Sequence, residues 1–116
     1  MTIQLILDQD ELFRRILDDW IQENGNISSA AFQNTSNTND MSVNLSRLTT
    51  PEETVSEYPH CGVASFLAGF ARKLDQKVLH DPILDNIAHS TVRGKKTKSI
   101  RKKIAEGSTV ILSPSK

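Results

Sequence analysis

The chain has 116 residues, of which 37% are hydrophobic and 24% are charged, and its formal net charge at pH 7 is zero. A chain of this length fits one domain and is apolar enough to bury a core, so we expect neither two domains nor a wholly disordered chain. The longest apolar run covers residues 61–71, whereas a bilayer span needs about 20 residues. The first seven residues lack the basic start of a secretory signal, and the lone Cys61 fits a reducing compartment. We predict a single soluble domain in the cytoplasm.

Two stretches of the chain carry hydrophobic residues at helical spacing. Apolar side chains at positions 12, 13, 16, 17, 20 and 21 predict an amphipathic helix that starts near Asp10 and ends at Asn24 and Gly25. The same pattern leaves residues 12–16 open to a second interpretation as a strand. Apolar side chains at positions 63, 66, 67, 70, 71 and 74 predict a buried helix over residues 62–74.

Shorter signals outline the other elements of the first half of the chain. A weak alternation over residues 3–7 indicates a short strand, and residues 41–45 alternate between apolar and polar in the pattern of a half-buried strand. Thr50 and Pro51 form a typical helix start, with Thr50 as the N-cap, so we predict a short helix that ends by Tyr58, just before a proline.

The second half of the chain adds three short strands and one helix. Residues 77–80, 88–93 and 109–112 have the composition of strands, and residues 98–106 predict a short basic helix that stops at Gly107. With the elements above, we expect an α+β fold, a small single domain of three or four helices with three to five short strands.

Residues 33–39 contain no apolar side chain. Their Ser, Thr and Asn side chains compete for backbone hydrogen bonds and favour turns, so we predict a mobile loop here. The chain is then a single domain over residues 1–116, with this loop and a basic C-terminal segment at 93–103.

Charge is distributed unevenly along the chain. Residues 1–92 carry six basic and 13 acidic side chains, a net charge of −7, whereas residues 93–116 carry eight basic side chains and one acid, a net charge of +7. Such an asymmetry is typical of an anion-binding face, and equally of two faces of one molecule that attract each other.

The basic segment gives the clearest functional signal. Its candidate anion-binding residues are Lys95, Lys96, Lys98, Arg101, Lys102 and Lys103. Several contacts of this kind to phosphates would make affinity fall steeply with salt. The alternative is a solvated helix face that balances an acidic body. Residues 94–97 match only the end of a P-loop, and no aromatic side chain lies nearby in the sequence to stack on bases.

Three histidines and one cysteine are scattered along the chain rather than paired at the spacing of a zinc site, so we expect no metal and no cofactor. Cys61 follows His60 at the predicted start of the 62–74 helix, where a helix dipole would favour the thiolate. A nucleophilic Cys–His pair is one interpretation of Cys61, and a small buried cysteine is the other.

His89 lies in the predicted strand 88–93, after a turn rich in Pro and Asn. A polar side chain that faces inward there needs a hydrogen-bond partner, and Ser28, Ser29 and Ser42 are candidates to supply it. The candidate catalytic residues are therefore His89, Ser28, Ser29 and Cys61, with a structural histidine as the alternative.

Several short pieces of the sequence form a combined pattern. They are Ser28–Phe32, Met41–Val43, Asp81–Pro82, Asn86–His89 and Gly94–Lys98. Together they resemble a family of short uncharacterised bacterial proteins, over about residues 12–105. The resemblance brings no function with it, and it implies that the turn at 81–86 and the loop at Gly94 belong to the domain.

Three classes of function follow from these features. The favoured one is an accessory or binding module whose basic C-terminal face engages an anionic partner, either nucleic acid or an acidic protein surface. The second is a small enzyme or toxin-like factor with a polar site around His89, Ser28, Ser29 and an arginine. The third is a structural interaction subunit that uses the apolar faces of 12–21 and 63–74, with homo-oligomers included. No membrane partner is expected.

Overall fold

The computed structural model describes residues 2–115, which form a six-stranded antiparallel sheet with short helices on both sides. The strands are β1 (Glu11–Leu17), β2 (Asp40–Leu45), β3 (Cys61–Leu67), β4 (Lys77–His80), β5 (His89–Arg93) and β6 (Thr109–Leu112). Their order across the sheet is β4-β5-β2-β1-β3-β6, and each pair of neighbours is antiparallel.

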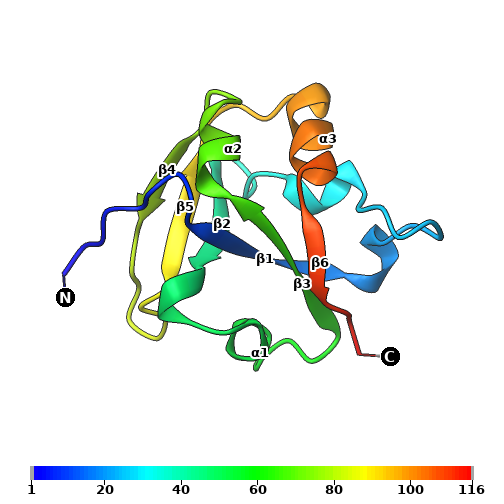
Figure 1. Cartoon of the computed structure of the whole chain (residues 1–116), viewed down its shortest axis with the longest axis horizontal. Helices are drawn as coiled ribbons and strands as arrows, with labels where there is room; N and C mark the ends of the chain where they lie inside the picture. Colours follow the sequence, from blue (N-terminus) through cyan, green and yellow to red (C-terminus); the bar gives the residue numbers. More distant parts are fainter. Residues whose placement is uncertain (1, 116) are drawn as a thin grey trace.

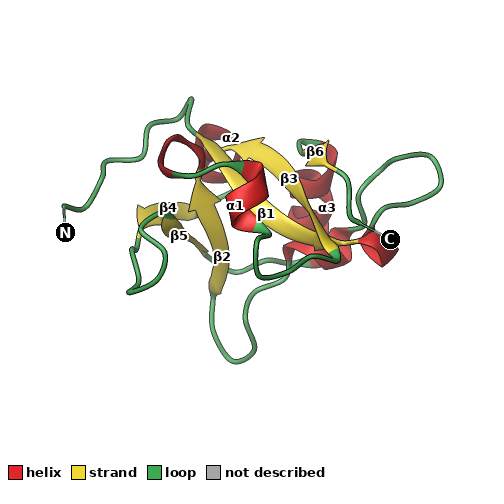
Figure 2. Ribbon diagram, turned by 90° about the horizontal axis from the view of Figure 1, so that it is seen from below, coloured by secondary structure: helices red, strands yellow, loops and turns green. Residues whose placement is uncertain are grey.

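The helices are short. They are α1 (Pro51–Thr54), α2 (Ala68–Arg72) and α3 (Lys98–Glu106), together with the 3-10 turns η1 (Asp18–Trp20), η2 (Ser29–Phe32) and η3 (Ser46–Leu48). In Figure 1, α2 and α3 lie above the strands and α1 lies below them. Figure 2 shows how strongly the sheet twists between the pair β4–β5 and the pair β1–β3. Among residues 2–115, no helix is long and apolar enough to cross a membrane.

The predicted α+β fold with three or four helices is wrong, because the two longest predicted helices contain strands. The first of them is β1 followed by η1. Leu12 and Ile16 are completely buried on the face that α2 and α3 cover, while Phe13 is buried on the opposite face. Since both faces of this strand are buried, its apolar residues occur in adjacent pairs, and these pairs imitate a helical period. The alternative interpretation of 12–16 as a strand is correct.

The predicted helix over 62–74 divides at Leu67. The seven residues Cys61–Leu67 form β3, which pairs along its whole length with β1, and only Ala68–Arg72 are α-helical. Small residues in β3 allow neighbouring strands to approach closely. At Gly62, an added Cβ atom would collide with the Leu112 carbonyl of β6. Cys61 is therefore the first residue of a strand, and the helix-dipole argument for its thiolate no longer applies.

The predictions for the shorter elements are mostly confirmed. The strands β2, β4, β5 and β6 lie where the sequence placed them, although residues 3–7 form no strand. The helix start at Thr50 is confirmed, since its Oγ1 accepts a hydrogen bond from Glu53 N at 3.1 Å, but α1 ends as early as Thr54. The basic helix α3 spans the predicted residues, with Thr97 as N-cap and Gly107 as C-cap.

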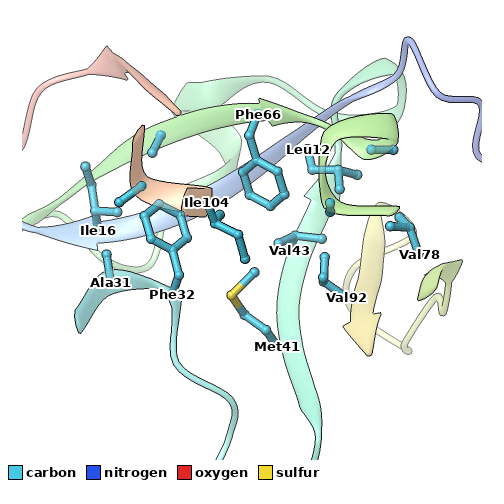
Figure 3. Packing of buried hydrophobic residues seen from close by; sticks show 14 of the residues in the cluster. Leu12, Ile16, Ala31, Phe32, Met41, Val43, Phe66, Val78, Val92 and Ile104 are labelled. Carbon is cyan, nitrogen blue, oxygen red and sulfur yellow. The ribbon is translucent and has the colours of Figure 1, made fainter. Parts of the chain in front are cut away.

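The hydrophobic core fills the space between the sheet and the layer formed by α2, α3 and η2 (Figure 3). Phe66 of β3 and Phe32 of η2 meet edge to face, with their ring centroids 6.0 Å apart. Ile104 of α3 is fully buried beside them. Of the apolar residues that the hypothesis of a structural interaction subunit relied on, Leu12, Ile16 and Phe66 lie in this core, whereas Leu17 and Leu67 are exposed.

Candidate functional site

Two clefts on different sides of the molecule hold the candidate residues. The first, which we call the polar cleft, lies over the face of the sheet that α1 partly covers. Its volume is about 580 Å³. It is lined by Phe13, Arg14, Arg15, Ser42, Val43, Asn44, Thr49, Glu53, Thr54, Ser56, Glu57, Tyr58, Ile83, Asp85, Asn86 and His89. Charged and uncharged polar side chains outnumber the apolar ones in this lining.

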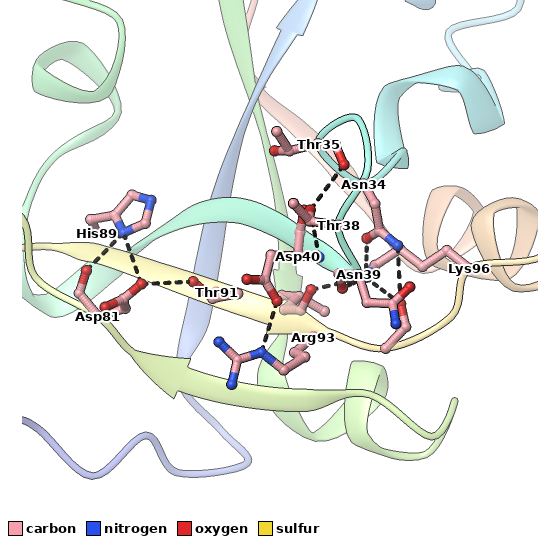
Figure 4. A network of polar contacts seen from close by, with 12 residues as sticks. Asn34, Thr35, Thr38, Asn39, Asp40, Asp81, His89, Thr91, Arg93 and Lys96 are labelled. Atoms are coloured by element: carbon pink, nitrogen blue, oxygen red, sulfur yellow. Dashed lines mark hydrogen bonds and ion pairs between the residues drawn. The ribbon is translucent and has the colours of Figure 1, made fainter.

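His89, the first residue of β5, lies in the polar cleft with partners on both ring nitrogens. Its Nδ1 is 2.8 Å from the backbone carbonyl oxygen of Asp81 and 3.9 Å from the Asp81 carboxylate (Figure 4). Its Nε2 is 3.2 Å from the Ser42 hydroxyl of β2. The histidine side chain is 17% exposed, so it is held in place but still reachable from the cleft.

A buried amide network forms one wall of the polar cleft. Asn44 of β2 is only 6% exposed, and its Nδ2 donates to Thr54 Oγ1 of α1 at 3.2 Å. Its Oδ1 accepts from Asn86 Nδ2 at 2.8 Å, and Asn86 Oδ1 in turn accepts from Ala88 N at 3.1 Å. These bonds tie α1 and the turn before β5 to the sheet, so the cleft has a fixed shape.

Two neighbouring arginines of β1 leave opposite faces of the strand. The guanidinium of Arg14 donates to the carbonyls of Ala31 and Ser42 at 2.9 and 2.8 Å. Burial, with the adjacent positive charge of Arg15, lowers the pKa of Arg14 to about 10. The guanidinium of Arg15 instead lies 4.0 Å above the centre of the Tyr58 ring, in the polar cleft. Arg15 is therefore the positive group that this cleft presents to a ligand.

The other predicted partners of His89 lie elsewhere. Ser28 caps η2, where its Oγ accepts from Ala30 N at 3.2 Å, and both Ser28 and Ser29 line the second cleft. Cys61 is half-buried at the start of β3 and does not line the polar cleft. Of the three serines considered from the sequence, Ser42 is the one that contacts His89.

The second cleft, which we call the basic cleft, lies between α3 and the segment 22–29, and its volume is about 810 Å³. Lys98 and Lys102 come from successive turns of α3 and line it together with Ser28 and Ser29. Other lining residues are Gln22, Gly25, Asn26, Ile27, Ala105, Glu106, Ser108, Thr109 and Val110. Two members of the predicted anion-binding set thus share one concave surface with two predicted serines.

Lys96 is not part of that surface. It is 8% exposed, and its Nζ donates to Asn34 Oδ1 at 2.6 Å, to Val92 O at 2.9 Å and to Gly94 O at 3.1 Å (Figure 4). Burial lowers its pKa to about 8, although the nearby Asp40 carboxylate opposes this shift. Lys96 therefore holds the loop 33–39 against the end of β5, a role that the composition of the loop did not indicate.

The remaining basic residues differ in what they contact. Lys95 and Lys103 are exposed, and Arg101 is half-buried with its Nε lacking a hydrogen-bond partner among residues 2–115. Arg93 is engaged with Asp40, since its Nε donates to Asp40 Oδ1 at 2.8 Å. This hydrogen bond keeps the pKa of Asp40 below its usual value. The free positive charge of the segment is thus concentrated on α3.

The sequence analysis did not identify Asp81, which contacts His89, or Arg15, which lines the polar cleft, as site residues. Asp81 comes directly after β4, and the β4–β5 register pairs His80 with Ser90, which places Asp81 opposite His89. A hairpin assignment for these two predicted strands would have found this pair. Arg15 would have been found by choosing the strand for 12–16, because alternation then places it on the side of Phe13.

No group of three or more His, Cys, Asp or Glu side chains within residues 2–115 is arranged to hold a metal ion. Comparison with protein-family models, with curated proteins and with solved structures gives no match to this chain. The resemblance to short bacterial proteins therefore stays a prediction, and function has to be argued from the two clefts.

Proposed function

We propose that the protein is a small binding module that contacts the phosphate groups of nucleic acid through the basic cleft. The observation that carries this proposal is the position of Lys98 and Lys102, which lie four residues apart on α3 and line one wall of the cleft. Ser28 and Ser29 lie on the opposite wall. Phosphate oxygens are bound in proteins by this combination of lysines and hydroxyl groups.

The charge of the basic cleft supports the same proposal. Its lining has two lysines and one acid, Glu106, and the exposed Lys95 and Lys103 add positive charge nearby. Like charges at positions i and i+4 of a helix disfavour each other by roughly 0.2–0.5 kcal/mol. A bound anion would relieve this repulsion between Lys98 and Lys102, because it neutralises both charges at once.

The type of recognition follows from what lines the cleft. No aromatic side chain is among its lining residues, so bases have no ring to stack on there. Binding through lysines and hydroxyls to phosphates carries little sequence information. The proposal is thus a sequence-tolerant interaction in the cytoplasm, with an acidic protein surface as the alternative partner.

The proposal is tested by titrating short DNA and RNA duplexes and single strands into the protein at two ionic strengths. Changing Lys98 and Lys102 together to Gln should weaken binding and reduce the slope of log affinity against log salt by about 1.4–1.8 units, because each phosphate contact contributes roughly 0.7–0.9. The fold should be unaffected, since exposed charges contribute little to stability.

A matched control removes the same charge from another surface. Lys73 and Lys77 are exposed and lie outside both clefts, so changing both to Gln should leave the salt dependence as it is. Equal weakening by both pairs would show that only net charge matters and would contradict a defined site. Absence of binding to every nucleic acid at low salt would exclude this proposal and leave the acidic protein surface.

A further inference from the structure

Ser42, His89 and Asp81 form a hydrogen-bonded line that nucleic-acid binding in the basic cleft does not use. Ser42 and His89 line the polar cleft, and Asp81 contacts His89 without lining the cleft itself. The Asp81 carbonyl oxygen, 2.8 Å from His89 Nδ1, can only accept a hydrogen bond. In the neutral imidazole Nδ1 therefore carries the hydrogen, and Nε2 keeps its lone pair. This lone pair accepts from the Ser42 hydroxyl at 3.2 Å, which is the relation between a serine nucleophile and its general base.

Three neighbouring strands hold this line in place. Across β2 and β5, Ser42 pairs with Thr91 and Asn44 pairs with His89, so Ser42 and His89 occupy diagonal positions on one face of the sheet. Asp81 is fixed against β5 because its N donates to His89 O at 2.9 Å and its Oδ2 accepts from Thr91 Oγ1 at 3.2 Å. Side chains set on paired strands need little reorganisation before a reaction.

The Asp81 carboxylate supplies the third requirement of a nucleophilic site. Its Oδ2 lies 3.9 Å from His89 Nδ1, close enough to stabilise the imidazolium that forms when the base takes up a proton. A volume of about 580 Å³ also falls in the range of small-molecule sites. The line of residues thus opens onto a space that a small substrate can enter.

We propose that Ser42 and His89 form an acyl-transfer site that hydrolyses a small ester. Ser42 Oγ attacks the ester carbonyl carbon while its proton passes to His89 Nε2. The carbon–oxygen bond to the alcohol breaks, and His89 returns the proton to the departing alcohol. Water then attacks the acyl-serine with its proton taken by His89, the bond from the acyl carbon to Ser42 Oγ breaks, and His89 returns the proton to Oγ, so the products are a carboxylic acid and free Ser42.

The charges around the cleft define the class of substrate. Glu53, Glu57 and Asp85 contribute three negative charges to the lining, while Arg14 is occupied with backbone carbonyls and Arg15 is the free positive group. An excess of negative charge favours substrates that are neutral or cationic. Arg15, stacked on Tyr58, is the positive group available to a developing oxyanion.

The experiment is labelling of the full chain with an uncharged alkyl fluorophosphonate, followed by mapping of the modified peptide by mass spectrometry. The reagent forms a phosphorus–oxygen bond to an activated serine and releases fluoride. We expect one adduct per chain, on Ser42, and none in Ser42→Ala. His89→Asn keeps an amide donor for the Asp81 carbonyl but has no Nε2 base, so labelling should slow by about 100-fold or more.

Ser56 is the matched control, because it lines the same cleft and its Oγ donates to Glu53 O at 3.0 Å without any histidine beside it. Ser56→Ala should label as the wild type does. An unmodified Ser42 in the folded wild type, or equal rates on Ser42 and Ser56, would overturn the proposal. If His89→Asn does not fold, the labelling rates of Ser42 and Ser56 in the wild type still test the proposal.

Turnover provides a second, independent readout of the site and of its substrate class. In a Cys61→Ser background, which removes the thiol as a competing nucleophile, a choline ester should be hydrolysed at least about 10-fold faster than a monoester of a dicarboxylic acid of similar length. Hydrolysis that survives Ser42→Ala would contradict the proposal. Neither readout involves Lys98 or Lys102, so a negative result here would leave the nucleic-acid proposal standing, and the reverse also holds.

Discussion

The polar cleft and the basic cleft differ in how the chain holds their functional groups. Ser42 and His89 sit on paired strands and bond to each other, so their geometry is fixed by the sheet. Lys98 and Lys102 are long side chains on an exposed helix face, and within residues 2–115 they have no ion-pair or hydrogen-bond partner. Rigid groups suit directed chemistry, whereas mobile charges suit diffuse attraction to an anion.

The two clefts also differ in the sign of their charge. Acidic residues outnumber free cations in the polar cleft, while lysines outnumber acids in the basic cleft. The uneven charge of the sequence allowed either an anion-binding face or two oppositely charged faces. In the structure, the acidic first part of the chain builds the polar cleft, and α3 supplies the lysines of the basic cleft. A polyanion should therefore avoid Ser42 and bind near Lys98.

The largest effect is expected from Phe66→Ala, which tests whether the two clefts depend on one core. Phe66 is 2% exposed and packs against Phe32, so its loss leaves a cavity that costs about 3–5 kcal/mol of the free energy of unfolding. Chemical denaturation measures this loss, and labelling of Ser42 and binding at α3 should disappear together. Loss of one activity at a lower denaturant concentration than the other would show that the clefts unfold separately.

A smaller effect is expected from Lys96→Met, which separates the structural lysine from the surface lysines. The variant leaves Asn34 Oδ1 without its donor and removes one donor from the carbonyls of Val92 and Gly94, at a cost of about 2 kcal/mol, although Gly94 O still accepts from Asn34 Nδ2. The control is Lys98→Met, which should melt close to the wild type but bind anions less well. A stable Lys96→Met variant would contradict the role assigned to this lysine.

The smallest effect, about 1–2 kcal/mol, is expected from Asn44→Ala, which perturbs the polar cleft alone. Removing this amide leaves Asn86 Nδ2 without its acceptor and takes one donor from Thr54 Oγ1, which keeps its hydrogen bond to Thr50 O, so α1 is held less firmly to the sheet. Thermal melting measures the loss of stability, and fluorophosphonate labelling should slow. Salt-dependent binding should be unchanged, and any change there would mean that the two clefts are coupled.

Local signals in the sequence predicted the local elements of the fold. Thr97 and Gly107 bound α3 as caps, and Thr50 starts α1, because a cap depends only on residues a few positions away. Alternation at 41–45 identified β2 for the same reason, since one strand face is enough to produce it. Whether residues 12–16 form a helix or a strand depended on which elements cover each face of the segment, and this is set by tertiary packing.

The sequence likewise predicted the candidate sites only in part. His89 and the lysines of α3 were found from residue type, but residue type could not separate Lys96 from Lys98, which differ only in burial. The three serines were equivalent in the sequence. Ser42 contacts His89 because β2 pairs with β5. A pairing between segments so far apart in the chain produces no local sequence pattern.

That pairing has a consequence for how the chain reaches its native state. Residues 44 and 89 are partners in the sheet, as are residues 65 and 109, so most of the sheet joins segments that are distant along the chain. Among the strand pairs within residues 2–115, only β4 and β5 are joined by a short connection. Chains dominated by such distant contacts must close long loops before any contact offsets the lost entropy, and they fold in milliseconds to seconds rather than microseconds. The line from Ser42 to Asp81 exists only when β5 is paired with β2, so it depends on one of these long-range contacts.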